Sequence, residues 1–240
     1  PVMGLAKQYA RSMRCGSNLH QLSLKLINYD VKNESFPYSF FDSNLKTEPP
    51  GGRIGNAVYD DVGWRWPNYI FDSSEGRLNE NPLYWCPSRR MEGRIFKNNM
   101  LVANYGVNES ICKSWSTNRD GEFAGSSLSS ADIRFPQQTL LIVDSGYTKI
   151  NWYHVTDSPP RTLGKSMEDR AYLPGLAMNK KRNLLPEQED DAKNGRHMNK
   201  TVNIGFVDGH IDSEKADNLF IEKTADGYKN LSPLWVPRKK

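Results

Sequence analysis

The sequence contains few of the residues, and none of the short motifs, that mark the common classes of enzyme and metal protein. Only three of its 240 residues are cysteine and four are histidine, and no CxxC or HxxxH pair occurs. Standard zinc sites depend on such spacings. Neither GxSxG nor HExxH is present, so the local signals of a serine hydrolase and of a zinc protease are missing too. From these absences we predict a protein that is not an enzyme and has no cofactor and no bound metal.

The sequence also lacks a long apolar run. No 18 consecutive apolar residues occur, so none of its segments is expected to cross a bilayer as a helix. Hydrophobic residues make up only 37% and the mean hydropathy is −0.71. Six Trp, eleven Tyr and nine Phe offset this thin supply, because each aromatic side chain buries a large area. No repeat, linker or low-complexity segment divides the chain, and we predict a single domain over residues 1–240.

Strong charge of one sign is absent as well. The formal net charge is +4, and the basic clusters are confined to Lys180–Arg182 and Arg238–Lys240. Clusters of this size are typical of a solvated loop and a solvated tail. We therefore predict no nucleic-acid partner.

The first 30 residues carry the clearest structural pattern. Apolar side chains recur at helical spacing and form one stripe, with mostly basic and polar side chains opposite. The stripe consists of Leu5, Tyr9, Met13, Leu19, Leu22, Leu26 and Tyr29. Residues Asn33–Pro37 end the helix, because the residue before a proline is disfavoured in helical conformation. The pattern predicts a long amphipathic helix over residues 1–30.

Three apolar segments further along the chain predict strands. Thr139–Val143 is a continuous apolar run, typical of a central buried strand. Leu101–Asn108 and Ile150–Val155 are shorter, and we expect strands there as well.

A fourth segment predicts a β-hairpin. Thr201–Val207 alternates, with Val202, Ile204 and Phe206 on one face of the strand. Asp208-Gly209 is typical of a two-residue turn, and His210–Asp212 begins the returning strand.

The remaining segments are rich in turn residues. Pro49–Gly52 breaks regular structure, and Ser116–Glu122 resembles part of a calcium loop but has serine at both the first and the twelfth position, so we predict a turn. The aromatic segment Val58–Phe71 is expected in the core, the alternative being a surface that binds sugar. Asp157–Asn194 is expected to be a long polar loop. Its four clustered acids suit a solvated loop or, alternatively, a cation site: Glu187, Glu189, Asp190 and Asp191.

The helical segment also carries a resemblance that its periodicity does not supply. Its residues look like the segment that follows the membrane helix in prepilin-like proteins. The matching residues are Ala10, Arg11, Cys15, Asn18, Leu19, Gln21, Leu24, Asn28, Tyr29, Phe36 and Pro37. In particular, the chain resembles the bacterial type II secretion pseudopilin-like family with a C-terminal His–Asp–Gly motif. Shorter patches at Cys86-Pro87-Ser88, Tyr105 and Pro136–Asp144 resemble elements of the same family.

The His–Asp–Gly motif itself is the most specific part of the resemblance. The residues that match it are Arg196, His197, Asn203, Phe206, Asp208, Gly209 and His210. One departure concerns spacing: ten residues separate His197 from Asp208, where nine are usual in the family. The strand keeps its register when counted back from Asp208. We therefore expect the additional residue in the turn Met198–Thr201, where it affects the direction of His197.

The resemblance implies an α+β, pilin-like fold in which a long N-terminal helix packs on an antiparallel sheet, with long irregular loops within residues 31–240. It implies a non-enzymatic pseudopilin-like subunit of a type II secretion or type IV pilus-like assembly. Its partners would be other pilin or pseudopilin subunits, and its location extracytoplasmic. Contact with these subunits and with the inner membrane would be made by an apolar helix, and we expect Pro1 to follow directly on that helix.

Two other functions stay open at this point. One is a surface module on a pilin-type anchor that binds carbohydrate or another ligand through its aromatic loops. The other is a metal-dependent hydrolase, for which His197, Asp208, His210 and Asp144 are the available side chains.

The resemblance also implies a disulfide between Cys15 and Cys86, which belong to matched elements, with Cys112 left free. Such a bond would close a loop of about 70 residues, which the chain-entropy model values at roughly 4 kcal/mol. A reduced, buried set of three thiols is the alternative.

Overall fold

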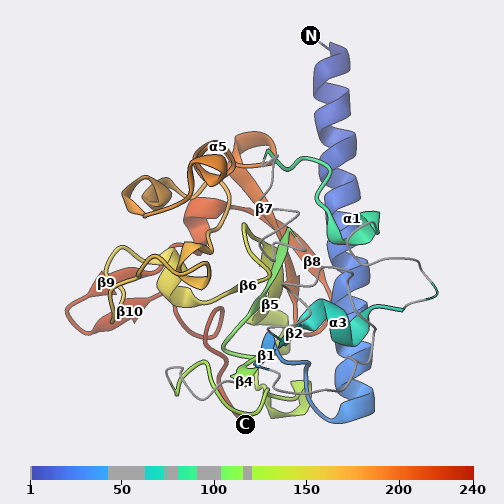
Figure 1. Cartoon of the computed structure of the whole chain (residues 1–240), viewed down its shortest axis with the longest axis vertical. Helices are drawn as coiled ribbons and strands as arrows, with labels where there is room; N and C mark the ends of the chain where they lie inside the picture. The colour runs from blue at the N-terminus through green and yellow to red at the C-terminus, as the bar shows by residue number, and fades with distance from the viewer. Residues whose placement is uncertain (1, 43–62, 73, 75–80, 91–103, 116–120) are drawn as a thin grey trace.

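The computed structural model describes residues 2–42, 63–72, 74, 81–90, 104–115 and 121–240. The chain is an α+β protein in which a long N-terminal helix, α1 (Val2–Asn33), lies against a five-stranded sheet (Figure 1). The strand order is β6-β3-β5-β7-β8. The strands are β3 (Tyr105–Asn108), β5 (Leu140–Asp144), β6 (Lys149–Ile150), β7 (Thr201–Phe206) and β8 (Ile211–Lys215). The predicted fold class is confirmed.

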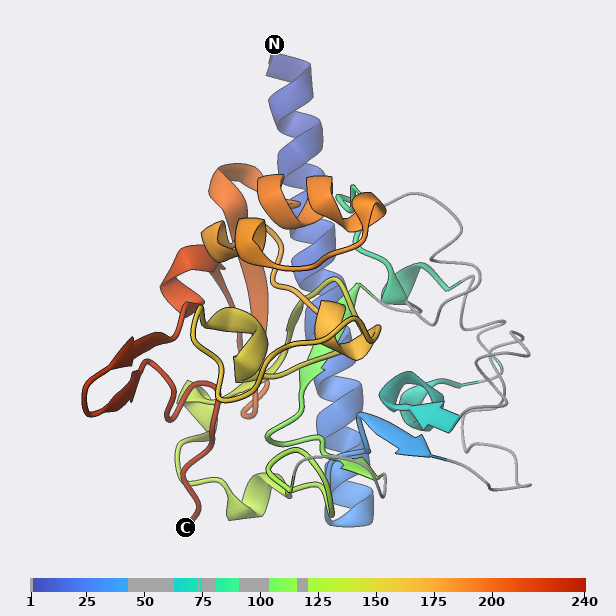
Figure 2. The ribbon, with the colours of Figure 1, turned by 60° about the vertical axis from the view of Figure 1, so that its left-hand side comes forward.

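Helix α1 is packed along only part of its length. Leu19, Leu22 and Leu26 are fully buried and form a core with the sheet. Leu5 and Met13, by contrast, are 49% and 76% exposed. The first turns of α1 extend beyond the globular body, which Figure 2 shows from a second direction. The predicted helix is therefore confirmed. Its apolar stripe is buried in the second half and exposed in the first half, where no other described element covers it.

The predicted central strand is confirmed. All five residues of β5 are buried, and β5 is antiparallel to both β3 and β7. The prediction of a strand over Ile150–Val155 is wrong beyond Ile150. Trp152–Val155 forms a short 3-10 helix, η6, because the Asn151 side chain accepts a hydrogen bond from the Tyr153 N–H and caps it.

The predicted hairpin is present, but its turn differs. Strands β7 and β8 pair antiparallel with Gly205 opposite Ile211. Four residues, 207–210, lie between the two strands, and the Phe206 N–H donates to the His210 carbonyl at 3.0 Å, which leaves three loop residues inside this hydrogen bond rather than the predicted two. Gly209 adopts φ 94° and donates its N–H to the Phe206 carbonyl at 3.0 Å. A glycine in the left-handed region is typical of three-residue hairpin loops.

The two faces of β7 contribute to two different cores, as the alternation predicted. Val202, Ile204 and Phe206 face away from α1 and pack against the C-terminal part of the chain. Gly205 lies on the α1 side, where a Cβ atom would collide with Ser23. The absence of a side chain there allows the helix to approach the sheet closely.

The predicted loop Asp157–Asn194 is instead folded into short helices. Its last part forms α5 (Pro186–Asn194), which starts with a proline and ends at Gly195 with φ 73°. The acidic cluster lies on this helix, and one of its members, Asp191, is buried. The remaining 3-10 helices of this segment are η7 (Glu168–Arg170) and η8 (Ala177–Lys181).

The smaller elements surround this framework. They include η3 (Pro82–Tyr84), α3 (Trp66–Ile70), the three-stranded sheet of β1 (Phe40–Asp42), β2 (Gly63–Arg65) and β4 (Ser114–Trp115), and the hairpin of β9 (Glu222–Thr224) and β10 (Gly227–Lys229). Trp66 of the predicted aromatic segment is fully buried in the core. In the part of the chain that is described, no helix combines the length and apolar character needed to cross a membrane.

Four predicted segments fall wholly or partly outside the described residues. They are Pro49–Gly52, residues 58–62 of the aromatic segment, residues 101–103 of the predicted strand and residues 116–120 of the predicted turn.

Candidate functional site

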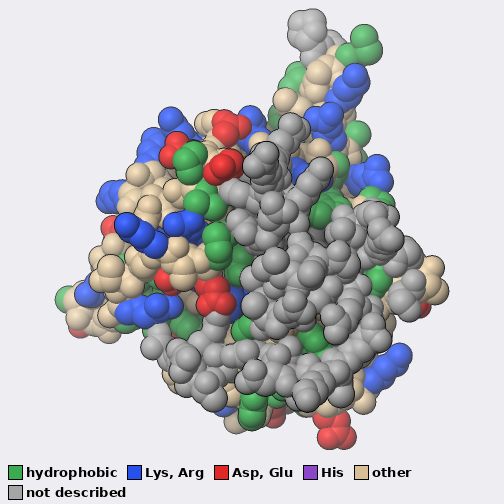
Figure 3. All heavy atoms as spheres, viewed as in Figure 1, with side chains coloured by type: hydrophobic (Ala, Val, Ile, Leu, Met, Phe, Trp, Pro, Cys, Tyr) green, Lys and Arg blue, Asp and Glu red, His purple; other side chains and the backbone are tan. Residues whose placement is uncertain are grey.

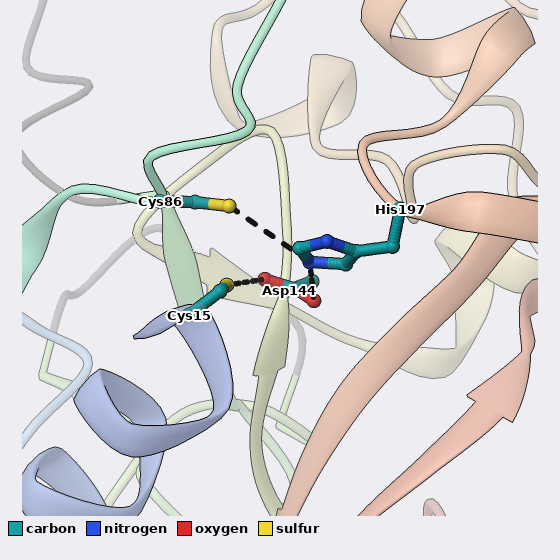
Figure 4. Close-up of side chains that lie close together, drawn as sticks. All are labelled: Cys15, Cys86, Asp144 and His197. Carbon is teal, nitrogen blue, oxygen red and sulfur yellow. Dashed lines mark hydrogen bonds and ion pairs between the residues drawn. The ribbon is translucent and has the colours of Figure 1, made fainter. Parts of the chain in front are cut away.

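Four side chains that could bind a metal converge in the interior, between α1 and the sheet (Figure 4). They are Cys15, Cys86, Asp144 and His197, which we call the thiol cluster. One donor atom from each lies within 4.8 Å of the others, and all four residues are buried. The cluster thus joins segments from Cys15 to His197, which are 182 residues apart in sequence.

Each member is positioned by a different element. Cys15 is on the packed face of α1, one turn before Leu19, and Cys86 follows η3. The predicted turn after Cys86 is present, with the Arg89 N–H donating to the Cys86 carbonyl. Asp144 is the last residue of β5, and His197 precedes β7.

Asp144 is at the centre of the contacts. Its Oδ1 accepts a hydrogen bond from the Cys15 thiol at 3.2 Å, and its Oδ2 lies 3.1 Å from His197 Nε2. The Asn203 backbone N–H also donates to Oδ2, at 2.7 Å. The same His197 nitrogen, Nε2, lies 3.8 Å from Cys86 Sγ.

A buried arginine holds the backbone around the cluster. Arg196 forms an ion pair with Asp191 at 2.8 Å and donates to the carbonyl oxygens of Asn104 and Ser145. The Asn104 side chain in turn accepts the Cys86 N–H at 3.0 Å. The residues next to His197, Asp144 and Cys86 are therefore tied to one another.

This environment shifts the pKa values of the cluster. Burial disfavours the charged form of His197, but the neighbouring Asp144 carboxylate outweighs it and raises the His197 pKa to about 10. Burial would also raise the pKa of Cys86, but hydrogen bonds from Cys15 and His197 lower it to about 6. For Cys15, burial dominates and raises the pKa. The arrangement favours negative charge on Asp144 and Cys86 beside positive charge on His197.

The residues of the His–Asp–Gly motif fall into two groups. Arg196, His197 and Asn203 lie at the thiol cluster. Asp208 and His210 lie at the exposed end of the hairpin, where His210 Nδ1 is 2.6 Å from Asp208 Oδ1. Gly209 shapes that turn, and Phe206 stacks on the His210 ring at a centroid distance of 4.2 Å. The four side chains considered for a hydrolase are thus divided into two pairs.

The turn Met198–Thr201, where the resemblance places an additional residue, has an unusual backbone. Asn199 and Lys200 both adopt φ 55°, a region that residues other than glycine seldom occupy. His197 nevertheless points inward to Asp144.

All three cysteines are buried free thiols. Cys15 and Cys86 lie in the thiol cluster, so the structure brings together the two residues for which a disulfide is predicted. The bond itself stays a prediction. Cys112 lies elsewhere in the core formed by α1 and the sheet.

A second buried polar group lies on the far part of the same sheet. Lys149 Nζ is 3.0 Å from Glu109 Oε1 and 3.2 Å from Ser114 Oγ. Asn151 donates to the other Glu109 oxygen at 2.7 Å. We call Glu109, Ser114, Lys149 and Asn151 the Lys149 cluster. Glu168, at 3.1 Å from Nζ, adds a second carboxylate at its edge.

Sequence reasoning missed the convergence at the thiol cluster. It associated His197 with Asp144, and Cys15 with Cys86, but for separate reasons. One signal was available: all four residues lie in patches that resemble the same family, although these patches are far apart in sequence.

Comparison with known proteins gives one match. Residues 5–77 match the model of a family described as "Protein of unknown function (DUF1559)". The match covers less than a third of the chain and includes most of α1 and Cys15. No curated protein and no solved structure matches.

Proposed function

We propose that the chain is the extracytoplasmic part of a pseudopilin-like subunit of a type II secretion or type IV pilus-like assembly, with a structural and not an enzymatic role. In this proposal an apolar helix continuous with α1 anchors the subunit in the inner membrane and contacts other subunits. Two findings support it. The fold has a pilin-like arrangement, and the family whose model matches residues 5–77 is associated with type II secretion pseudopilin-like proteins.

The observation that carries the proposal is the projecting part of α1. Four apolar side chains on it are exposed, namely Met3, Leu5, Tyr9 and Met13, with exposures from 49% to 80%. Basic side chains lie between them, and Figure 3 shows both kinds on the part of the helix that leaves the body. An isolated helical segment of this length is marginal in water. Contacts with neighbouring helices in an assembly would cover these side chains and stabilise the segment.

The proposal is tested by cysteine cross-linking in cells that express the complete gene together with a pilus-like assembly. The natural cysteines are all buried, so they give little background. We expect Met3→Cys and Met13→Cys to form cross-linked multimers in the inner-membrane fraction. Lys223→Cys, on the exposed β9 strand, is the matched control and is expected to stay monomeric. Monomeric, membrane-free protein for all three variants would contradict the proposal.

One observation favours a second candidate, a surface that binds carbohydrate through aromatic rings. Phe41 and Trp115 are stacked at a centroid distance of 6.2 Å, and Trp64 and Tyr38 adjoin them. Trp115 is 48% exposed. Sugar faces pack on such rings. A glycan array decides this candidate: binding that Trp115→Ala abolishes supports it, and an absence of binding by the unmodified protein rejects it.

A further inference from the structure

The thiol cluster has the composition of a metal site. It offers two thiols, one imidazole and one carboxylate, and sulfur, nitrogen and oxygen from these groups are the three kinds of ligand atom that protein-bound Zn²⁺ uses. Soft sulfur ligands favour Zn²⁺ over Mg²⁺ or Ca²⁺, which take oxygen ligands. Four donors also match the coordination number of a structural zinc site.

The distances suit one ion at the centre. Zinc bonds of about 2.0 to 2.3 Å in a tetrahedron place neighbouring donor atoms roughly 3.3 to 3.8 Å apart. In the thiol cluster, His197 Nε2 lies 3.1 Å from Asp144 Oδ2 and 3.8 Å from Cys86 Sγ, and Cys15 Sγ lies 3.2 Å from the other carboxylate oxygen, Asp144 Oδ1. All four donor atoms lie within 4.8 Å of each other, so only small side-chain rotations are needed.

The contacts of His197 point the same way. Its Nε2 faces the Asp144 carboxylate at 3.1 Å, the Asn203 side-chain amide nitrogen at 3.1 Å and the Cys86 sulfur at 3.8 Å. With a proton, Nε2 opposes the amide donor, and without one it opposes the carboxylate. Its Nδ1 is buried without a hydrogen-bond partner among the described residues. A cation in front of Nε2 removes the conflict between the contacts of that atom, because the imidazole lone pair, the carboxylate and the thiolate would all face the cation.

The surroundings hold the ligands in place. Asn203 donates from its backbone and its side chain to Asp144, and Arg196 ties together the backbone next to three of the ligands. Supports of this kind fix the direction of metal ligands. Because all four positions come from buried protein groups, no coordination position is left for a substrate, which is typical of a structural and not a catalytic site.

We propose that Cys15, Cys86, Asp144 and His197 bind one Zn²⁺ ion and that this ion fastens helix α1 to the sheet. On binding, Cys15 loses its thiol proton and the Cys86–His197 pair loses the one proton that it holds, both to solvent. The thiolates, the imidazole nitrogen and the carboxylate then replace water molecules bound to the ion, with no oxidation or reduction. The site goes beyond the proposed function and does not depend on it. It also excludes the Cys15–Cys86 disulfide, because the same sulfur atoms cannot do both.

The first experiment measures metal in protein purified under reducing conditions without an affinity tag that binds metal. We expect one zinc per chain by mass spectrometry of the metal. After removal of zinc, titration with Co²⁺ is expected to give the intense absorption of tetrahedral thiolate coordination. Less than one tenth of an equivalent of zinc, together with no thiolate band, overturns the proposal and would show any metal to be adventitious.

Substitutions then identify the ligands. Cys86→Ser and His197→Ala are each expected to weaken zinc binding at least 100-fold. Two matched controls are expected to keep one zinc per chain: Cys112→Ser, a buried thiol outside the thiol cluster, and His210→Ala, the exposed histidine of the hairpin. Full zinc content in Cys86→Ser overturns the proposal. Should the ligand variants fail to fold, the Co²⁺ spectrum of the unmodified protein and of Cys112→Ser decides.

A last measurement separates the proposal from its rival. Protein exported to an oxidising compartment is mapped by non-reducing peptide analysis. Two alkylatable thiols at Cys15 and Cys86 after removal of zinc support the metal site. A Cys15–Cys86 disulfide in the zinc-free, freshly isolated protein overturns it.

Discussion

The thiol cluster and the Lys149 cluster are both buried and both sit on the five-stranded sheet, yet their groups are satisfied in different ways. In the Lys149 cluster each charge faces an opposite charge, and Ser114 and Asn151 each donate a further hydrogen bond to Glu109. In the thiol cluster, acceptors and acidic groups crowd around one nitrogen of His197. A buried set of charges that is complete needs nothing from outside. In the thiol cluster one atom, His197 Nε2, faces a carboxylate, a sulfur and an amide donor at once, and a bound cation would satisfy the carboxylate and the sulfur together.

The same contrast appears in the two buried histidines. His154 lies beside the Lys149 cluster and uses both ring nitrogens: Asn151 N–H donates to Nδ1, and Nε2 lies 3.0 Å from the Glu168 carbonyl. Burial first, and then the charge of Arg182, lower its pKa to about 3. His197, beside a carboxylate, has its pKa raised to about 10. Burial alone therefore does not decide the charge of a histidine, because its neighbours do.

The largest expected effect is in the Lys149 cluster. Lys149→Met removes the cation that lies 3.0 Å from the buried Glu109 carboxylate, and breaking a buried pair in this way costs about 3–5 kcal/mol. Denaturant unfolding measures the loss. Lys229→Met is the matched control, because its pair with Glu222 is exposed and 3.9 Å long, and it is expected to change stability by less than about 0.5 kcal/mol. Equal losses of unfolding free energy for Lys149→Met and Lys229→Met would contradict the view that the Lys149 cluster is a buried, complete set of charges.

The next effect is a pH dependence that follows from His154. Above its ordinary pKa of 6.5, both the folded and the unfolded chain hold a neutral imidazole. As the pH falls below this value, the unfolded chain takes up a proton, but the folded chain does not until about pH 3. Stability is thus lost on acidification, by about 2 kcal/mol between pH 7 and pH 5.

The contribution of His154 is isolated by comparing the free energy of unfolding of the unmodified protein and of His154→Gln at each pH. Other titrating groups cancel in the difference. A difference that stays constant from pH 7 to pH 5 would show that His154 is protonated in the folded state.

A substitution in the β7–β8 turn, outside both clusters, gives a reference against which the losses of stability expected in the clusters can be compared. Gly209→Val is expected to cost about 1–2 kcal/mol, because a β-branched residue resists a positive φ. The added side chain would also contact Ile27 at close range. Thermal unfolding measures the change. Gly4→Ala, in open space on α1, is the control, and it is expected to leave the melting temperature unchanged or slightly higher. An unchanged melting temperature for Gly209→Val would mean that the turn adapts.

The smallest effect is expected in the thiol cluster itself. With a chelator present, Cys15→Ala removes one thiol hydrogen bond and a small apolar volume, for about 1 kcal/mol. With zinc present, the loss should be clearly larger, because the ligand is removed too. Unfolding curves of both proteins in both conditions measure this difference. If Cys15→Ala lowers the free energy of unfolding by the same amount with zinc and with chelator, the thiol cluster binds no zinc, and the contrast with the Lys149 cluster fails.

The regular elements could be predicted from the sequence because their signals are local. The packed half of α1, strand β5 and the β7–β8 hairpin each follow from periodicity or from an apolar run. The exposed half of α1 could not be foreseen, since the same periodicity describes covered and uncovered faces. Helix η6 was missed because one capping side chain, Asn151, overrides the strand propensity of Trp152–Val155.

The candidate site was predictable only in fragments. Asp144 was placed at the end of a central strand, and His197 ahead of the hairpin, by their local patterns. Their meeting with Cys15 and Cys86 depends on how α1 crosses the sheet, which no local spacing encodes. The resemblance named all four segments, but it could not show that their side chains meet at one point.

The projecting helix has a mechanical consequence. Cys15 is the first fully buried side chain of α1 among those that the structure describes, so the 13 helical residues 2–14 before it extend over about 20 Å at 1.5 Å per residue. A sideways force at the N-terminal end of this projecting segment acts as a torque on the rest of the protein, and Cys15 lies where the segment meets the core. The contacts of Cys15 within the thiol cluster are therefore the first ones along α1 to resist such a force.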